Sequence, residues 1–163
     1  MKLLIMFFVF TIVISAQPKT VIDKETQKPM LVGIGDRTAF NDTSFSGWFN
    51  KEYLFYKVKE EVFDSVITGL QDLNVTIVMG TWCGDSRREV PRFYKILDKL
   101  DFPKEYIRLI FVDRDKQGLE DEVEDLDVEL VPTIIFFRDG KELGRIVEAP
   151  YKTLEEDMKE ILE

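Results

Sequence analysis

Residues 75–86 read VTIVMGTWCGDS, and this stretch decides the fold. Residues 75–79 are apolar or β-branched, which indicates a strand buried on both faces, as in a parallel sheet. Residues 87–100 carry apolar side chains at helical spacing, so we expect a helix directly after the strand. Cys83 therefore stands at a strand-to-helix junction, where unpaired backbone N–H groups and the helix dipole favour a thiolate.

The neighbours of Cys83 bear on its reactivity. Gly84 allows another backbone to approach closely, and the arginines at 87–88 add positive potential that Asp85 opposes. Ser86 is near enough in a helical turn for its hydroxyl to hydrogen-bond the sulfur, but a serine cannot attack a disulfide. The alternative is a buried, inert cysteine, which is the ordinary state of free cysteines. The junction beside a glycine favours at least partial exposure of the sulfur.

The flanking elements predict an α/β domain. In chain order they are a helix at 58–70, a strand at 107–112, a short helix within 119–127, and a strand, turn and strand within 131–150. The turn at Asp139-Gly140 is typical of an antiparallel hairpin. Thr153 and Glu156 form a capping box for a last helix. This order predicts a three-layer α/β sandwich, with a mixed central sheet flanked by helices and an N-terminal helical extension.

Residues 1–16 predict a secretory signal peptide. Lys2 is followed by an apolar run at 3–14 and by small residues before Gln17. A bilayer span needs about twenty apolar residues, so we expect cleavage near Ala16 and no stable membrane span afterwards. An uncleaved anchor or a buried N-terminal segment is the alternative. The pattern predicts an exported protein, periplasmic or secreted.

Residues 17–57 are expected to form an N-terminal extension to a domain at 58–163. The first part is polar and rich in turn residues, which predicts a loosely structured arm with a short strand at 30–32. An aromatic stripe at helical spacing follows, and it contains Trp48, Phe49, Tyr53 and Tyr56. The stripe could line a ligand site, but packing of a helix on the sheet is the simpler interpretation.

The composition excludes several classes of function. The net charge is −9, which disfavours nucleic acid and anionic membranes as partners. Because the chain has no histidine, it has no Ser-His-Asp or Cys-His catalysis and no histidine metal ligand. A single cysteine excludes a structural zinc site and an intramolecular disulfide. We expect neither a metal site nor a cofactor.

One acidic stretch approximates a calcium loop. Its residues are Asp113, Asp115, Gln117, Gly118 and Glu124. The glutamine departs from the pattern, and the flanking element is a strand where the loop needs a helix. A solvated acidic loop explains the stretch better, and calcium is not expected as a partner.

These residues together resemble the thioredoxin family, over about 75–163. TWCGDS is similar to the family's WCGPC active site, with Asp85 in place of proline and Ser86 in place of the second cysteine. Pro91 matches the proline that kinks the active-site helix. VPT at 131–133 resembles the family motif whose proline is cis; an ordinary trans proline leading a strand is the alternative.

The resemblance implies a role for each matched residue. Cys83 would be the nucleophile, with Ser86 beside it, and Trp82 would shield the site. Val131 would offer its backbone to an extended substrate, and Pro132 would shape the groove. The implied substrate-binding residues are Trp82, Gly84, Asp85, Val131, Pro132 and Thr133.

Two departures from the family argue against efficient dithiol chemistry. Ile77 stands where thioredoxins carry a buried acid, and Glu148 stands where they usually have a glycine beside the groove. We therefore expect a monothiol oxidoreductase or isomerase that forms mixed disulfides with protein thiols or disulfides through Cys83, with glutathione as a candidate external thiol. A catalytically inactive thioredoxin-fold binding module is the alternative.

Overall fold

The computed structural model describes residues 17–163, so the predicted signal peptide at 1–16 lies outside the described residues. The chain forms a six-stranded sheet in the order β1-β2-β4-β3-β5-β6. The strands are β1 (Lys19–Ile22), β2 (Pro29–Gly35), β3 (Leu73–Met79), β4 (Ile107–Phe111), β5 (Thr133–Arg138) and β6 (Lys141–Val147). β3 and β4 are parallel and the other neighbouring pairs are antiparallel. The predicted α/β sandwich with a mixed sheet is confirmed.

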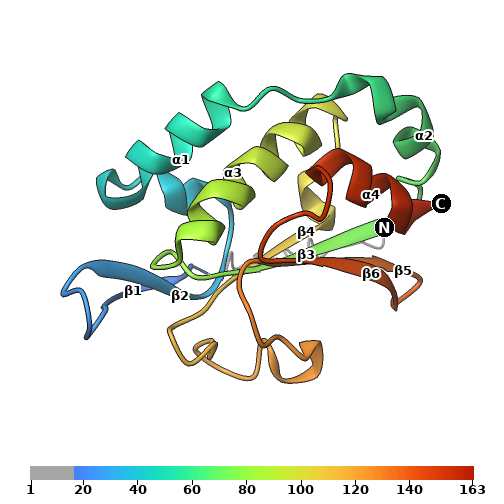
Figure 1. The fold of residues 1–163 in the computed structure, drawn as a ribbon. Helices are drawn as coiled ribbons and strands as arrows, with labels where there is room; N and C mark the ends of the chain where they lie inside the picture. The colour runs from blue at the N-terminus through green and yellow to red at the C-terminus, as the bar shows by residue number, and fades with distance from the viewer. Residues whose placement is uncertain (1–16) are drawn as a thin grey trace, which may run out of the picture.

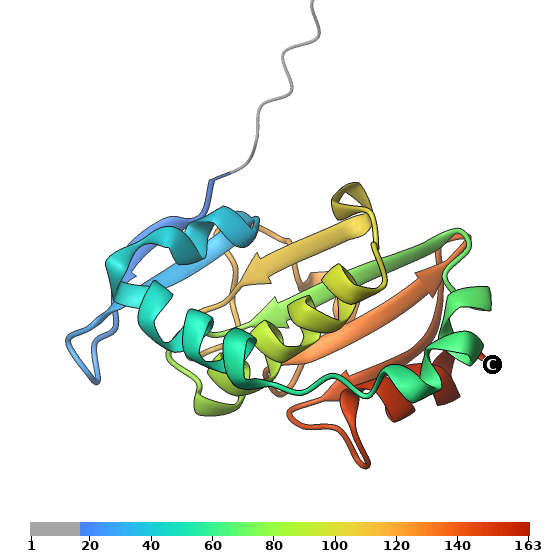
Figure 2. The ribbon, with the colours of Figure 1, turned by 90° about the horizontal axis from the view of Figure 1, so that it is seen from above.

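Helices stack over one face of this sheet (Figure 1). They are α1 (Thr43–Phe55), α2 (Phe63–Thr68), α3 (Gly84–Lys99) and α4 (Leu154–Leu162). Figure 2 shows α3 along the middle of the sheet, α1 on the side of β1 and β2, and α4 on the side of β6. Under α3, the rings of Phe93 and Phe136 meet edge to face at 5.9 Å, and both side chains are fully buried. No helix within residues 17–163 combines the length and apolar character that a bilayer crossing requires.

The opposite face of the sheet is covered by the segment 112–132 (Figure 1). We call it the covering segment. It is largely irregular and contains one 3-10 turn, Glu124–Leu126, where the sequence predicts a short helix. Its Val123 packs against Val78 and Ile110 of the sheet. Trp82 and Cys83 lie at the edge of this second apolar cluster.

The expectation of a loose N-terminal arm is wrong. β2 pairs with β4, with Gly33 opposite Phe111, and β1 pairs with β2 in turn. Phe40 and Phe49, whose rings stack at 4.4 Å, are buried in the helix-side core. The aromatic stripe thus packs α1 into the domain, as in the simpler interpretation. The arm was mispredicted because β2 joins the rest of the sheet by pairing with β4, a strand more than seventy residues away.

Local signals in the C-terminal half were accurate. Asp139 and Gly140 both have positive φ, as the tight hairpin between β5 and β6 requires. The Thr153 hydroxyl accepts a hydrogen bond from the Glu156 N–H at the start of α4, which confirms the capping box. The helix expected at 58–70 is shorter than predicted, because a 3-10 turn, Glu60–Val62, precedes α2.

Candidate functional site

Cys83 is the N-cap residue of α3. Its backbone is extended, with φ −83° and ψ 131°, and its carbonyl accepts the first helical hydrogen bond from the Arg87 N–H at 3.1 Å. The first N–H groups of α3 therefore point toward the end at which the sulfur lies. The side chain is partly exposed. A Cβ added to Gly84 would meet no atom within 4 Å, so there is open space next to the cysteine.

Antiparallel pairing of β3 with β5 brings the cysteine to Pro132. Val78 lies opposite Thr133, so the residues that follow β3 meet those that precede β5. The Cys83 thiol donates a hydrogen bond to the Val131 carbonyl, with Sγ and O 3.1 Å apart. The Val131–Pro132 peptide bond is cis. The structure therefore brings Cys83, Val131 and Pro132 together at this edge of the sheet.

Thr133 and Val131 contribute backbone and packing at this edge. Both are buried, and the Thr133 hydroxyl donates to the Leu130 carbonyl at 2.7 Å. The Glu148 N–H donates to the Pro132 carbonyl at 2.7 Å, and Glu148 has a φ of 58° with an exposed side chain. Glycine adopts this left-handed backbone conformation without steric cost, so it would be favoured at this position.

Trp82 is fixed beside the cysteine. Its indole N–H donates to the Val112 carbonyl at 3.0 Å. The ring lies against Gly80, where an added Cβ would come within 2.5 Å of the indole. The absence of a side chain at Gly80 therefore leaves room for the Trp82 ring, and any larger residue at position 80 would displace it.

The predicted hydrogen bond from the Ser86 hydroxyl to the Cys83 sulfur is not formed in the part of the chain that the structure describes. Its side chain is fully buried, and its hydroxyl accepts a hydrogen bond from the Gly80 N–H at 3.3 Å. Among the described residues, no hydrogen bond joins this hydroxyl to the Cys83 sulfur. The serine instead ties the first turn of α3 to the end of β3, because the N–H that follows the strand needs a partner in the interior.

Arg87 and Arg88, which were expected to add positive potential at the sulfur, contact other groups. Arg87 donates to the Thr81 carbonyl at 2.5 Å, and its guanidinium lies 5.8 Å from the Trp48 ring centroid. Arg88 pairs with Asp85 at 2.6 Å and with the buried Glu89 at 2.5 Å. Asp85 is thereby neutralised within the first turn of the helix.

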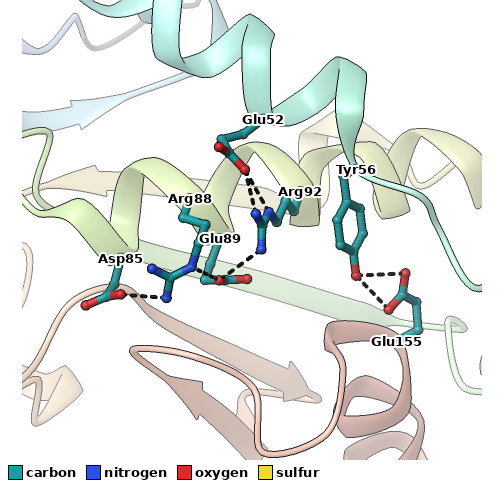
Figure 3. A network of polar contacts seen from close by, with 7 residues as sticks. All are labelled: Glu52, Tyr56, Asp85, Arg88, Glu89, Arg92 and Glu155. Carbon is teal, nitrogen blue, oxygen red and sulfur yellow. Dashed lines mark hydrogen bonds and ion pairs between the residues drawn. The ribbon is translucent and has the colours of Figure 1, made fainter.

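Figure 3 shows that this pairing continues along α3 to α1. Arg92 contacts Glu89 at 3.5 Å and forms an ion pair with Glu52 of α1 at 2.7 Å. Next to it, the Tyr56 hydroxyl donates to the buried Glu155 of α4 at 2.9 Å. The outer side of α3 is thus occupied by structural ion pairs.

Arg114 is a site residue that sequence analysis missed. Its guanidinium lies 5.0 Å from the Trp82 ring centroid and forms an ion pair with the buried Asp23 at 2.8 Å. The local sequence gives no signal for this pairing, since the two residues are 91 positions apart.

The remaining expectations concern Ile77 and the acidic stretch. Ile77 is fully buried in the helix-side core, so this position supplies no acid under the cysteine. The Asp113 carboxylate accepts the N–H groups of Asp115 and Gln117, as in a turn that closes on itself. Within residues 17–163, no group of three or more histidine, cysteine or acidic side chains is arranged to hold a metal ion.

Comparison with known proteins assigns the family. The Thioredoxin family model matches residues 55–160. Thioredoxin of Mus musculus is 26% identical over 102 residues, which cover 62% of this chain and 91% of the relative. Thioredoxin H-type of Picea mariana is 37% identical over 75 residues, which cover 46% of this chain and 55% of the relative.

A solved structure shows the same fold at lower identity. An HIV epitope scaffold is 16% identical, with a TM-score of 0.52 over 78% of this chain and 89% of its own. The family match spans β3, α3, the cis prolyl bond and the β5–β6 hairpin, which are the parts that build the site around Cys83. The chain belongs to the thioredoxin family.

Proposed function

We propose that this protein is an exported monothiol thiol–disulfide oxidoreductase or isomerase that forms mixed disulfides with protein cysteines through Cys83. The observation that carries the proposal is the position of the sulfur. It lies partly exposed at the start of α3, beside open space and 3.1 Å from the carbonyl that precedes cis-Pro132. Family membership supports protein disulfides as the substrate class.

The proposed reaction begins with attack of the Cys83 thiolate on one sulfur of a partner disulfide. The partner S–S bond breaks as the mixed disulfide forms, and the second partner sulfur leaves as a thiolate that takes a proton from water. For isomerisation, a partner thiolate attacks the mixed disulfide and regenerates Cys83 with no net change in oxidation state.

Net reduction requires an external thiol, for which glutathione is the candidate. A first external thiol attacks the Cys83 sulfur and releases the reduced partner. A second attacks the resulting mixed disulfide, restores Cys83 and leaves as an oxidised dimer. Two external thiols are oxidised for each partner disulfide reduced, so the electrons balance.

The monothiol character rests on two positions. Ser86 stands where a second cysteine would release the partner, and its hydroxyl is committed to Gly80. Ile77 stands among apolar neighbours where an acid would assist that second cysteine. The two features agree, since neither a second cysteine nor an acid that assists it is needed when an external thiol completes the cycle.

The export part of the proposal rests on the signal-like pattern of residues 1–16. Cell fractionation followed by N-terminal sequencing tests it. We expect the protein in the exported fraction with Gln17 as its first residue. Recovery of the intact N-terminus from the cytoplasmic fraction would show that this part is wrong.

The thiol chemistry is tested with the purified protein and a disulfide-bonded peptide. We expect wild type to accumulate a mixed disulfide that glutathione resolves, and to reactivate a scrambled disulfide substrate when glutathione is present. Cys83→Ala serves as the control and should do neither. A wild-type thiol that reacts with iodoacetamide only after unfolding would contradict the proposal.

A binding module without turnover is the second candidate. It is favoured by the hydrogen bond that the Cys83 thiol donates to the Val131 carbonyl, because this bond already engages the sulfur within the protein. Cys83→Ser retains a hydrogen-bond donor there. Equal capture of partners by wild type and Cys83→Ser from an extract of the exported compartment would favour binding. Loss of capture in the variant would favour thiol chemistry.

A further inference from the structure

Arg114, in the covering segment, is clamped to the turn between β1 and β2. Its Nε and Nη2 donate to the two carboxylate oxygens of Asp23 at 2.9 and 2.8 Å, a bidentate arrangement, and Nη1 contacts Glu25 at 2.8 Å. Asp23 is 1% exposed, and it also accepts the Thr26 hydroxyl at 2.6 Å. With all these donors in place, the carboxylate holds the guanidinium in one position.

The clamped guanidinium lies on the Trp82 ring at cation–π distance. The ring is also held by its hydrogen bond to Val112, by its contact with Gly80 and by packing against the second apolar cluster. The indole is therefore held between backbone and Arg114, immediately before Cys83 in the chain.

Arg114 also interacts electrostatically with the sulfur. Its pKa is raised chiefly by the hydrogen bond to Asp23, with smaller contributions from the charges of Asp23, Glu25 and Cys83. A cation close to a thiol favours the ionised form of that thiol over its neutral form.

The other charged groups near Cys83 make their contacts away from Trp82 or are exposed. On α3 they are the Asp85–Arg88 pair and Arg87, which is bound to the Thr81 carbonyl. After β6, Glu148 is exposed. Among these cations, Arg114 is the one that lies on the tryptophan next to the sulfur.

We propose that Arg114 is a positioning residue for Cys83: Asp23 clamps it over Trp82, so that the indole stays packed beside the sulfur and the guanidinium favours the anionic sulfur. The inference rests on the proposed function in taking Cys83 as the reacting group. It makes the β1–β2 hairpin part of the site, although Asp23 lies outside the residues that the family model matches.

The first test is the rate of Cys83 alkylation by iodoacetamide as a function of pH. Arg114→Met should move the midpoint to higher pH and slow the reaction at neutral pH by about 3–10-fold, the change that half to one pKa unit produces. Arg114→Lys keeps the charge but loses the bidentate hydrogen bonds and the stacking on Trp82. Its midpoint should therefore lie between those of wild type and Arg114→Met. Arg145→Met removes another carboxylate-paired arginine, on β6, and should match wild type.

Asp23→Asn distinguishes the effect of holding Arg114 in place from the effect of the Asp23 charge itself on the alkylation midpoint. Removal of a negative charge alone would move the alkylation midpoint to lower pH, whereas release of the clamp moves it to higher pH. A midpoint that stays or falls in Asp23→Asn would overturn the clamp. If Arg114→Met fails to give a cooperative thermal transition, Arg114→Lys and Asp23→Asn carry the test.

The second test follows Trp82 directly and does not depend on thiol chemistry. In a Trp48→Phe background, Trp82 is the single tryptophan, and acrylamide should quench its fluorescence more strongly in Arg114→Met and Asp23→Asn. Unchanged quenching and an unchanged alkylation profile would overturn this inference while leaving the proposed function intact. A wild-type thiol inert at every pH would overturn the proposed function and the electrostatic part of this inference, and the quenching would still decide whether Arg114 holds Trp82.

Discussion

The hydroxyl of Ser86 accepts a hydrogen bond from the backbone N–H of Gly80 at 3.3 Å, and both residues are buried. Ser86→Ala leaves that N–H without a partner, which should lower the free energy of unfolding by about 1–3 kcal/mol. Urea denaturation measures the change. Ser46→Ala on α1 is the control and should stay within about 0.5 kcal/mol of wild type. Equal stability of both variants would show that the hydrogen bond contributes little.

Ser86→Cys should convert the site to one that releases its own mixed disulfides. When Cys83 attacks dithionitrobenzoic acid, it forms a mixed disulfide and releases one thionitrobenzoate. A cysteine at position 86 can then attack the Cys83 sulfur, form an intramolecular disulfide and release a second equivalent. Absorbance should report two equivalents for Ser86→Cys and one for wild type and Ser86→Ala. A single equivalent from Ser86→Cys would show that the buried side chain cannot reach the sulfur.

Tyr56→Phe should destabilise the junction between α1 and α4. Glu155 is fully buried and accepts a hydrogen bond from the Tyr56 hydroxyl (Figure 3). It also accepts one from the Lys59 N–H at 3.0 Å. Loss of one donor to a buried carboxylate should cost about 1.5–3 kcal/mol in chemical denaturation. Tyr53→Phe removes a hydroxyl bound to the more exposed Asp98, so its effect should be smaller. The reverse order would contradict the assignment.

Asp23 should make the protein less stable in acid. The hydrogen bond from Arg114 is the largest of the effects that hold the pKa of this carboxyl well below its usual value. The unfolded chain therefore binds more protons as the pH falls below about 4, and stability is lost in that window. Thermal melts between about pH 5 and pH 2 should show a steeper loss for wild type than for Asp23→Asn. Parallel pH profiles would show that Asp23 is not linked to folding.

Local sequence signals predicted most of the elements around the site. The strand at 75–79, the helix that follows it and the β5–β6 hairpin each depend on neighbours in the chain. The meeting of Cys83 with Val131 was predictable only through the resemblance to a known family, because strand pairing brings the two together.

Other features of the site had no local signal. The Arg114–Asp23 clamp joins residues 91 positions apart, and the β2–β4 pairing that makes it possible joins residues more than seventy positions apart. Ser86 was misplaced for a different reason. A hydroxyl three residues after the cysteine can reach either the sulfur or the end of β3, and burial of the Gly80 N–H decides for the strand.

The two faces of the sheet are covered differently, which implies that local opening is more frequent on one face than on the other. Helices close one face, while the covering segment closes the other with largely irregular backbone. Native-state hydrogen exchange should therefore be fast in that segment and slow in β3 and α3, which open only on global unfolding. Because Cys83 and Trp82 lie against the labile side, fluctuations there can admit a reactant to the sulfur without loosening the helical core.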